Sequence, residues 1–133
     1  YSPVSVERAQ ELNRKAIQAG RCVVTQGSVQ DMLFAGNWFD AVTAFETVYF
    51  WPELPRSFRE VRRVLKPGGI FLLCNECGGG DPKDEKWTEK IPGMTIYTPE
   101  ELRGFLQQAG FQDIQVHQNG KGWLCMTARK GEA

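Results

Sequence analysis

The sequence carries no excess of either charge and contains no long apolar segment. Lysine and arginine together number 16, as do aspartate and glutamate, so the formal net charge is zero. This balance argues against a general nucleic-acid-binding protein, which usually has a basic excess. No apolar run approaches the roughly 20 residues that span a membrane, and no signal peptide is visible. We therefore expect neither nucleic acid nor a membrane as a partner.

Cysteine and histidine are also scarce. Three of the four cysteines, Cys22, Cys74, Cys77 and Cys125, lie in apolar, strand-like surroundings. We expect them to be reduced and buried, which favours a cytoplasmic protein. Cys74-x-x-Cys77 lacks the two further ligands of a zinc site, and alternation along a strand points the pair apart, so we expect no metal. The one histidine, His117, is expected on the surface, remote from any site.

The stretch "RRVLKPGGIFLLCNE", residues 62–76, predicts a helix, a tight turn and a buried strand. Pro67 cannot continue a helix, and the two glycines after it adopt backbone angles that other residues resist. The apolar run that follows suits a strand covered on both faces, as in a parallel sheet. Asn75 and Glu76 come where this strand ends, which is the end at which open α/β sheets bind ligands.

Helical and strand patterns alternate along the rest of the chain. Leu54, Phe58, Val61 and Leu65 keep helical spacing, and Thr98 with Glu101 matches a capping box. An alternation of this kind, closed by an antiparallel pair, predicts one α/β domain over residues 1–133. The expected elements are helix 3–19, strand 21–26, strand 39–48, helix 51–67, strand 69–76, a long polar loop 77–94, helix 99–109 and strands 111–118 and 122–130.

The segment "FDAVTAFETVYFWPELPRSFREVRRVLKPGGIFLLCNE" and the tail "EELRGFLQQAGFQDIQV" resemble class I S-adenosylmethionine-dependent methyltransferases, more narrowly the small-molecule group often labelled type 11. The resemblance covers nearly the whole chain. It implies a Rossmann-like, mostly parallel sheet with a C-terminal antiparallel strand. It also implies that the chain carries the family's third to seventh strands, the last four in the order four, five, seven, six. The first two strands are missing.

Other features of the family are absent from this sequence. The glycine-rich loop near the methionine part of the cofactor and the acidic residue that holds the ribose have no counterpart here. The chain also begins at Tyr1 on a helix cap. We therefore expect the C-terminal portion of a methyltransferase domain, inactive by itself, whose parent transfers a methyl group from S-adenosylmethionine to a small-molecule acceptor.

The resemblance also assigns residues to the cofactor. Ser28 and Val29 stand where relatives contact the adenine, and Asp31 is a substitute for the usual acid; a plain turn is the alternative. Ala44, Phe45 and Glu46 end the strand that passes the methionyl group. Glu46 is expected to be a base or a polar clamp, the alternative being a solvated strand end.

Further residues are expected to act on the acceptor side. Tyr49 is the aromatic residue of "VYFWP" that we place in the site, near a sulfonium that it could attract. Asn75 and Glu76 stand at the mouth of the site. Trp87 and Tyr97, in or just after the long polar loop, are expected to form a lid over the acceptor or a plug against the body.

Two other functions compete with methyl transfer. One is a non-catalytic binding or interaction module that keeps the methyltransferase-like fold, because fold does not imply function. The other is a nicotinamide-dependent enzyme, which nothing positive supports. Without the first two strands of the family, strand 39–46 is left with an open edge, which invites pairing with another chain. We therefore expect a homo-oligomer whose interface includes Val42, Ala44 and the first helix.

Overall fold

A computed structural model describes residues 2–132, which fall into two compact units that meet in sequence at Leu33 and Phe34. The first unit holds helices α1 (Pro3–Leu12) and α2 (Arg14–Gln18). Ser2 caps α1 as expected, accepting a hydrogen bond from the Ser5 N–H at 3.4 Å. The predicted single helix is wrong because Asn13 interrupts it. Its side-chain amide donates to the Ala9 carbonyl at 2.8 Å, and such bonds compete with regular helix geometry.

The predicted strand at residues 21–26 does not form. This segment is irregular, and the Val23 side chain is 80% exposed. A β-branched run becomes a strand only where a neighbouring strand satisfies its backbone groups. No strand of residues 2–132 pairs with this segment, and the nearest regular feature is an isolated bridge between Ser28 and Asp31.

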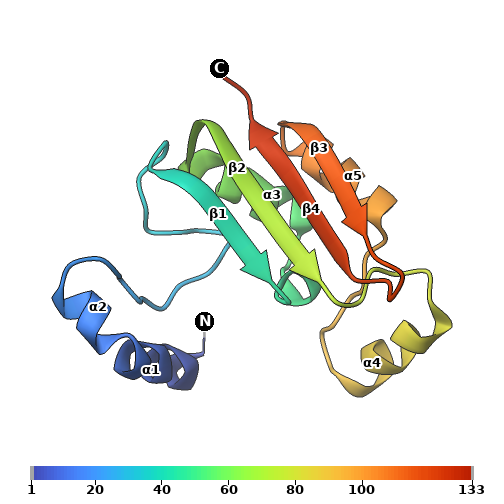
Figure 1. Cartoon of the computed structure of the whole chain (residues 1–133), viewed down its shortest axis with the longest axis horizontal. Coiled ribbons are helices and arrows are strands. Elements are labelled where there is room, and N and C mark those ends of the chain that lie inside the picture. Colours follow the sequence, from blue (N-terminus) through green and yellow to red (C-terminus); the bar gives the residue numbers. More distant parts are fainter. Residues whose placement is uncertain (1, 133) are drawn as a thin grey trace. The chain divides into compact units, whose positions relative to one another are not determined.

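The second unit is built on a four-stranded sheet with the order β1-β2-β4-β3 (Figure 1). β1 runs parallel to β2, and the β2–β4 and β4–β3 pairs are antiparallel. This order is the one that the family resemblance implies for the last four strands, so the predicted α/β class is confirmed. The strands are β1 (Phe39–Phe45), β2 (Leu65–Asn75), β3 (Phe111–Gln118) and β4 (Leu124–Lys130).

Helices α3 (Leu54–Val64) and α5 (Pro99–Gln108) lie on one face of this sheet (Figure 1). Their apolar stripes form the core, as the helical spacing predicts. The Thr98–Glu101 capping box is present at the start of α5. The ring of Phe71 lies at the centre, 5.6 Å from Phe58. The largest fully buried core side chains include Phe58, Val61, Val64, Leu65, Phe71, Leu73, Leu102, Leu106, Leu124 and Met126.

Among residues 34–132, no helix covers the opposite face of the sheet (Figure 1). Along β2 the side chains that face α3 and α5 are buried, whereas Ile70, Leu72 and Cys74 are only half-buried. Phe45 next to them is 58% exposed. For the second unit taken by itself, the prediction of a strand covered on both faces is therefore wrong.

The Lys-Pro-Gly-Gly stretch shapes the entry to β2. α3 ends at Val64, and β2 starts at Leu65, earlier than the sequence predicts. The register shifts there, because Phe39 pairs with Leu65 whereas Ala41 pairs with Ile70. Gly68 has a φ of 78°, which favours glycine. The stretch therefore forms a bulge inside the strand.

Three short helices complete the unit: η1 (Val48–Phe50), η2 (Pro82–Asp84) and α4 (Glu85–Lys90). The last two lie where the sequence predicts only a polar loop. Asp81 explains their start, because its side chain accepts a hydrogen bond from the Lys83 N–H at 2.9 Å. Among the described helices, none is both long and apolar enough to cross a membrane.

A buried lysine ties the last strand to the carboxyl end of α3. The Lys130 ammonium donates to the Leu65 carbonyl at 2.8 Å and to the Asn37 side-chain oxygen at 2.7 Å. A cation is favourable beside the carbonyl groups that end a helix. Burial lowers the pKa of this ammonium, so its partners are needed to keep the charge inside the fold.

Replacing Lys130 by methionine should therefore destabilise the protein. The substitution keeps the apolar stem but leaves the Leu65 carbonyl without its donor, and we expect the free energy of unfolding to fall by about 1–3 kcal/mol. Urea denaturation measures this change. Lys90→Met, on the exposed end of α4, is the matched control. Equal stability of the two variants would show that the Lys130 contacts contribute nothing.

Candidate active site at the strand ends

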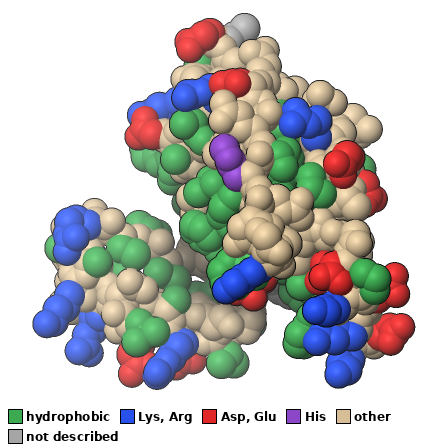
Figure 2. Space-filling view, turned by 45° about the vertical axis from the view of Figure 1, so that its right-hand side comes forward, with side chains coloured by type: hydrophobic (Ala, Val, Ile, Leu, Met, Phe, Trp, Pro, Cys, Tyr) green, Lys and Arg blue, Asp and Glu red, His purple; other side chains and the backbone are tan. Residues whose placement is uncertain are grey.

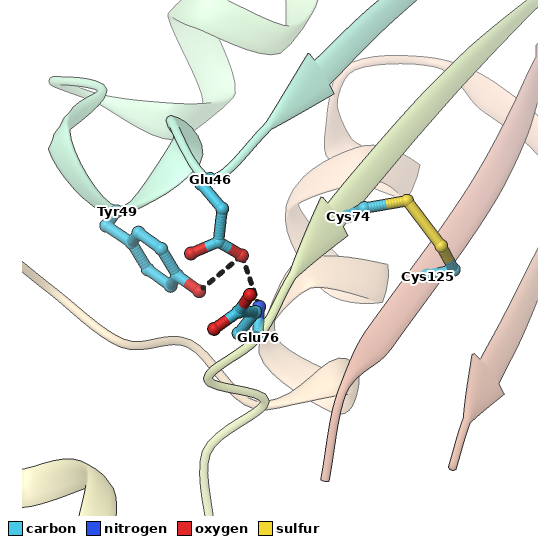
Figure 3. The surroundings of a disulfide bond; sticks show 5 residues. All are labelled: Glu46, Tyr49, Cys74, Glu76 and Cys125. Atoms are coloured by element: carbon cyan, nitrogen blue, oxygen red, sulfur yellow. Dashed lines mark hydrogen bonds between the residues drawn. A yellow bond between two sulfur atoms is a disulfide. The ribbon is translucent and has the colours of Figure 1, made fainter. Parts of the chain in front are cut away.

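The ends of β1 and β2 are joined through the side chain of Glu46. Its Oε1 atom accepts hydrogen bonds from the Tyr49 hydroxyl, at 3.3 Å, and from the backbone N–H of Glu76. The Tyr49 oxygen in turn accepts from the Cys77 N–H at 2.9 Å. Figure 3 shows the Glu46 and Tyr49 side chains pointing toward Glu76 beyond the end of β2. We call these contacts the strand-end network.

The backbone of Glu46 reflects this arrangement. Its φ is 58°, in the left-handed region that non-glycine residues enter at a cost of about 1–3 kcal/mol. Such a conformation persists where surrounding contacts fix it, and the bonds to Oε1 do so here. The left-handed turn directs the carboxylate back over the end of β2 instead of along β1.

Tyr49 contributes to the network as a neutral donor. Its side chain is 3% exposed, and burial, followed by the negative charge of Glu46, raises the pKa of its hydroxyl well above the usual value. Burial and then Asp84 likewise raise the pKa of the Cys77 thiol. Tyr49 is therefore poorly suited to accept a proton and well suited to hold Glu46 in place.

A cavity of about 480 Å³ lies on the open face of the sheet beside this network. Phe45, Trp123 and the Cys74–Cys125 pair contribute its apolar lining, and Glu46 and Glu76 contribute carboxylates. Figure 2 shows hydrophobic side chains gathered next to the histidine on this face. Ligand sites commonly have this composition, with apolar walls and a few polar groups.

Cys74 and Cys125 form a disulfide across β2 and β4 (Figure 3). They are directly opposite in the strand register, with Cα atoms 4.4 Å apart. The prediction of reduced, buried cysteines is thus wrong for this pair. None of the four cysteines is fully buried, since Cys22 and Cys77 are half-buried free thiols. The sequence separation of 51 residues gives no indication that the two strands are adjacent.

The structure brings together four of the predicted site residues. Phe45, Glu46, Asn75 and Glu76 all line the cavity. Ala44, predicted to contact the cofactor, does not line it and is 4% exposed, because its side chain is on the face covered by the helices. The alternation of side chains along β1 explains this difference.

The two residues predicted to form a lid do not line this cavity. Trp87 is in α4, 40% exposed, with the Lys86 ammonium 4.9 Å from its ring centre. Tyr97 packs edge-on against Phe105 of α5, with ring centres 5.9 Å apart. This contact of Tyr97 is consistent with the alternative hypothesis, in which the side chain packs against the body of the domain. A role in acceptor binding remains a prediction for both residues.

The residues predicted to meet the adenine belong to the first unit. The Ser28 hydroxyl accepts a hydrogen bond from the Gln30 N–H at 3.2 Å, and Ser28 bridges to Asp31. Val29 lies between them and is half-buried. These contacts define a local turn. The cofactor role of Ser28, Val29 and Asp31 remains a prediction.

His117 and Trp123 are among the cavity residues that the sequence did not predict. His117 was expected far from the site, which is wrong. β3 and β2 are both antiparallel to β4, so they run in the same direction and end at the same edge of the sheet. Within residues 2–132, no three histidine, cysteine, aspartate or glutamate side chains gather in a way that could hold a metal.

The fold is that of a methyltransferase domain. Residues 1–73, more than half of the chain, match the family described as "Methyltransferase domain". The chain therefore belongs to this family.

Curated relatives extend the similarity over almost the whole chain. A chloroplastic 2-methyl-6-phytyl-1,4-hydroquinone methyltransferase of rice is 28% identical over 98% of this chain and 38% of its own length. Cycloartenol-C-24-methyltransferase 1, also from rice, is 38% identical over 54% of this chain and 21% of its own. The chain spans about a third of the length of the hydroquinone methyltransferases it matches.

Solved structures share the fold. Human N-acetylserotonin methyltransferase, determined in complex with S-adenosylmethionine, aligns with a TM-score of 0.66 and 20% identity. The alignment covers 80% of this chain and 33% of the human protein. At this identity the likeness concerns the fold alone.

The disulfide determines how many free thiols the protein should contain before and after reduction. A denatured but unreduced sample should contain two free thiols per chain, Cys22 and Cys77, and a reduced sample four. Alkylation followed by peptide mass spectrometry identifies the labelled residues. In the native state, Cys77 should react slowly with iodoacetamide, because burial raises the pKa of its thiol. Labelling of Cys74 without reduction would contradict the observed pairing.

Proposed function

We propose that the protein containing this chain transfers a methyl group from S-adenosylmethionine to a small-molecule acceptor. The observation that carries the proposal is the cavity at the carboxyl end of the parallel β1–β2 pair, in a chain that belongs to a methyltransferase family. Ligands of open α/β sheets bind at this end of the strands. The names of the rice relatives, a hydroquinone and a cycloartenol methyltransferase, support an acceptor of small-molecule size.

The residues at the end of β1 fit a cationic cofactor. S-adenosylmethionine supplies an electrophilic methyl group on a positively charged sulfur, and it also carries an ammonium group. Phe45 exposes its ring there, and the two hydrogen bonds that the Glu46 carboxylate accepts from the described residues both go to Oε1. The Oε2 atom is therefore available to accept a hydrogen bond from an ammonium group, and an exposed ring attracts cations.

Within this proposal Glu46 and Tyr49 have different roles. Glu46 faces the ligands, where it holds the cofactor and can accept a proton from the acceptor. Tyr49 is a positioning residue, because it is buried and acts by donating its hydroxyl proton to Glu46. Methyl transfer requires mainly that donor and acceptor are aligned, so fixing the Glu46 carboxylate contributes to the rate.

We further propose that residues 1–133 alone transfer methyl groups slowly or not at all. The family's glycine-rich loop brings backbone N–H groups to the methionine part of the cofactor, and this sequence has no counterpart of it. The predicted cytoplasmic location is retained as part of the proposal. Disulfides are rare in cytosolic proteins, so the Cys74–Cys125 bond argues against this location.

Cofactor binding tests the proposal directly. Isothermal titration of the protein containing this chain with S-adenosylmethionine should give measurable heat. Glu46→Gln should weaken the affinity about tenfold, because the amide keeps an oxygen for the Glu76 N–H but loses the charge that pairs with an ammonium. Glu89→Gln, exposed on α4, is the matched control. The absence of heat or a thermal shift at millimolar cofactor would refute the proposal.

A homo-oligomer is a second proposal, which rests on the edge of β1. Within residues 2–132, β1 pairs only with β2, so its other edge carries unpaired backbone groups. Such an edge can pair with another chain through its backbone, with half-buried Val42 at its centre; the buried side chain of Ala44 would take no part. The first helix is the other element of the proposed interface.

Association should depend on this edge. Analytical ultracentrifugation at tens of micromolar should show a dimer or larger species. Thr43→Pro, on the exposed side of β1, should shift the distribution toward monomer, because proline cannot donate a hydrogen bond to a new strand. A clean monomer for the unmodified chain would rule out the association.

A further inference from the structure

A row of four side chains crosses the open face of the sheet along the cavity. Cys74 of β2 pairs in register with Phe45 of β1 and with Cys125 of β4. Cys125 pairs in turn with His117 of β3, and all four residues line the cavity. Alternation along β2 turns Leu73 toward the buried core and Cys74 toward the cavity. The disulfide is therefore part of the cavity wall.

The disulfide spans β2 and β4 (Figure 3), but these strands are also joined by their backbones. The pairing runs along Ile70–Asn75 of β2, opposite Leu124–Arg129 of β4. The core lies on the other face of the sheet, where Phe58 packs against Phe71. Neither feature requires the S–S bond. We therefore expect the bond to open while the sheet stays folded.

The position of the pair also makes it accessible to a reductant. Cys74 and Cys125 are half-buried and line a cavity of about 480 Å³. Exchange requires a thiolate to reach a disulfide sulfur, and exposed disulfides are the labile and regulatory ones. Where cytosolic proteins contain disulfides, these are usually transient and redox-sensing. The exposure of this pair therefore favours a reversible bond over a permanent one.

The free thiol of Cys77 is poorly placed to open this bond. Cys77 follows Cys74 by three residues, but it does not line the cavity. Burial, followed by the negative charge of Asp84, raises the pKa of its thiol. Because the thiolate is the form that attacks a disulfide, Cys77 is a weak nucleophile here. The electrons for reduction therefore come from a separate molecule.

We propose that the Cys74–Cys125 pair is a redox-modification site, reduced reversibly by a dithiol, whose state controls how tightly the cavity binds its ligands. The control of ligand binding rests on the proposed function, whereas the reversible reduction does not.

The exchange proceeds in two balanced steps. A thiolate of the dithiol attacks one sulfur of the pair, and the electron pair of the breaking S–S bond stays on the other sulfur, which takes a proton from solvent. The second thiol of the dithiol then loses its proton and attacks the mixed disulfide. This attack releases the remaining cysteine, which is protonated in turn. The protein gains two electrons and two protons, and the dithiol leaves as a cyclic disulfide.

Reduction changes the shape of the cavity wall. Bonded sulfur atoms lie about 2 Å apart, whereas nonbonded heavy atoms need about 3.5–4 Å. The two Cα atoms are 4.4 Å apart, and the strand pairing keeps them close. The thiols therefore turn away from each other, toward Phe45 on one side and His117 on the other. They then take up space beside the end of β1, where the proposed cofactor binds.

Reduction of the native protein tests whether the pair is reversible. Treatment of the protein containing this chain with dithiothreitol, then iodoacetamide, should label both Cys74 and Cys125 in peptide mass spectrometry. Far-UV circular dichroism should stay unchanged, and oxidised glutathione should restore the bond once dithiothreitol is removed. If both cysteines stay unlabelled until urea unfolds the protein, or if reduction itself unfolds it, the inference is overturned.

Calorimetry tests the control of ligand binding. After removal of dithiothreitol under nitrogen, the reduced protein should bind S-adenosylhomocysteine about fivefold more weakly than the oxidised protein, because the separated thiols crowd the cavity. A variant with both Cys74→Ser and Cys125→Ser should bind as weakly as the reduced protein, with or without prior reduction. Cys22→Ser, in the first unit, is the matched control and should keep the full redox response.

Failure of this inference and failure of the proposed function give different results. Equal affinity of the oxidised and reduced proteins for S-adenosylhomocysteine would overturn the redox control and leave the proposed function standing. If neither form gives heat with S-adenosylhomocysteine or S-adenosylmethionine, the proposed function fails, and the control of ligand binding fails with it. The labelling of Cys74 and Cys125 still decides, in that case, whether the pair is a redox-modification site.

Discussion

The hydrogen bonds accepted by one carboxylate oxygen of Glu46 connect the elements on which the site depends. They fix a left-handed turn after β1, hold the Tyr49 hydroxyl and capture the backbone N–H of Glu76 just beyond β2. The parallel pairing of β1 and β2 brings these groups within reach of one another.

The network has a chemical consequence as well as a structural one. The oxygen that accepts both bonds is committed to the fold, and the other accepts no hydrogen bond from the described residues. Because Tyr49 remains protonated in its buried position, it stabilises the charge on Glu46 without competing for a proton. The cavity is therefore bordered by carboxylates in defined positions, next to aromatic and sulfur-containing walls.

The sequence predicted those parts of the molecule that local patterns determine. The spacing of Leu54, Phe58 and Val61 defined the buried face of α3, and the capping box of α5 is present as expected. The family resemblance supplied the strand order and placed Phe45, Glu46, Asn75 and Glu76 at a common edge. All four residues follow from the rule that parallel strands end together.

The remaining features depend on contacts between distant residues. The disulfide needs Cys74 and Cys125 to be opposite in register, and His117 reaches the site only because two antiparallel pairings bring β3 back to the same edge. The run at 21–26 has strand composition, but the described chain offers it no partner. The residue pattern of a segment shows that it could pair with a neighbouring strand. It does not show whether such a strand is present.

The central claim is that the cavity at the ends of β1 and β2 holds the acceptor next to the cofactor. A crystal structure of the protein containing this chain, grown with S-adenosylhomocysteine, tests it most directly. The account predicts the sulfur of the cofactor product beside Phe45 and Glu46, with the rest of the cavity open to the acceptor. A cofactor product bound elsewhere, or a cavity filled by another part of the protein, would contradict it.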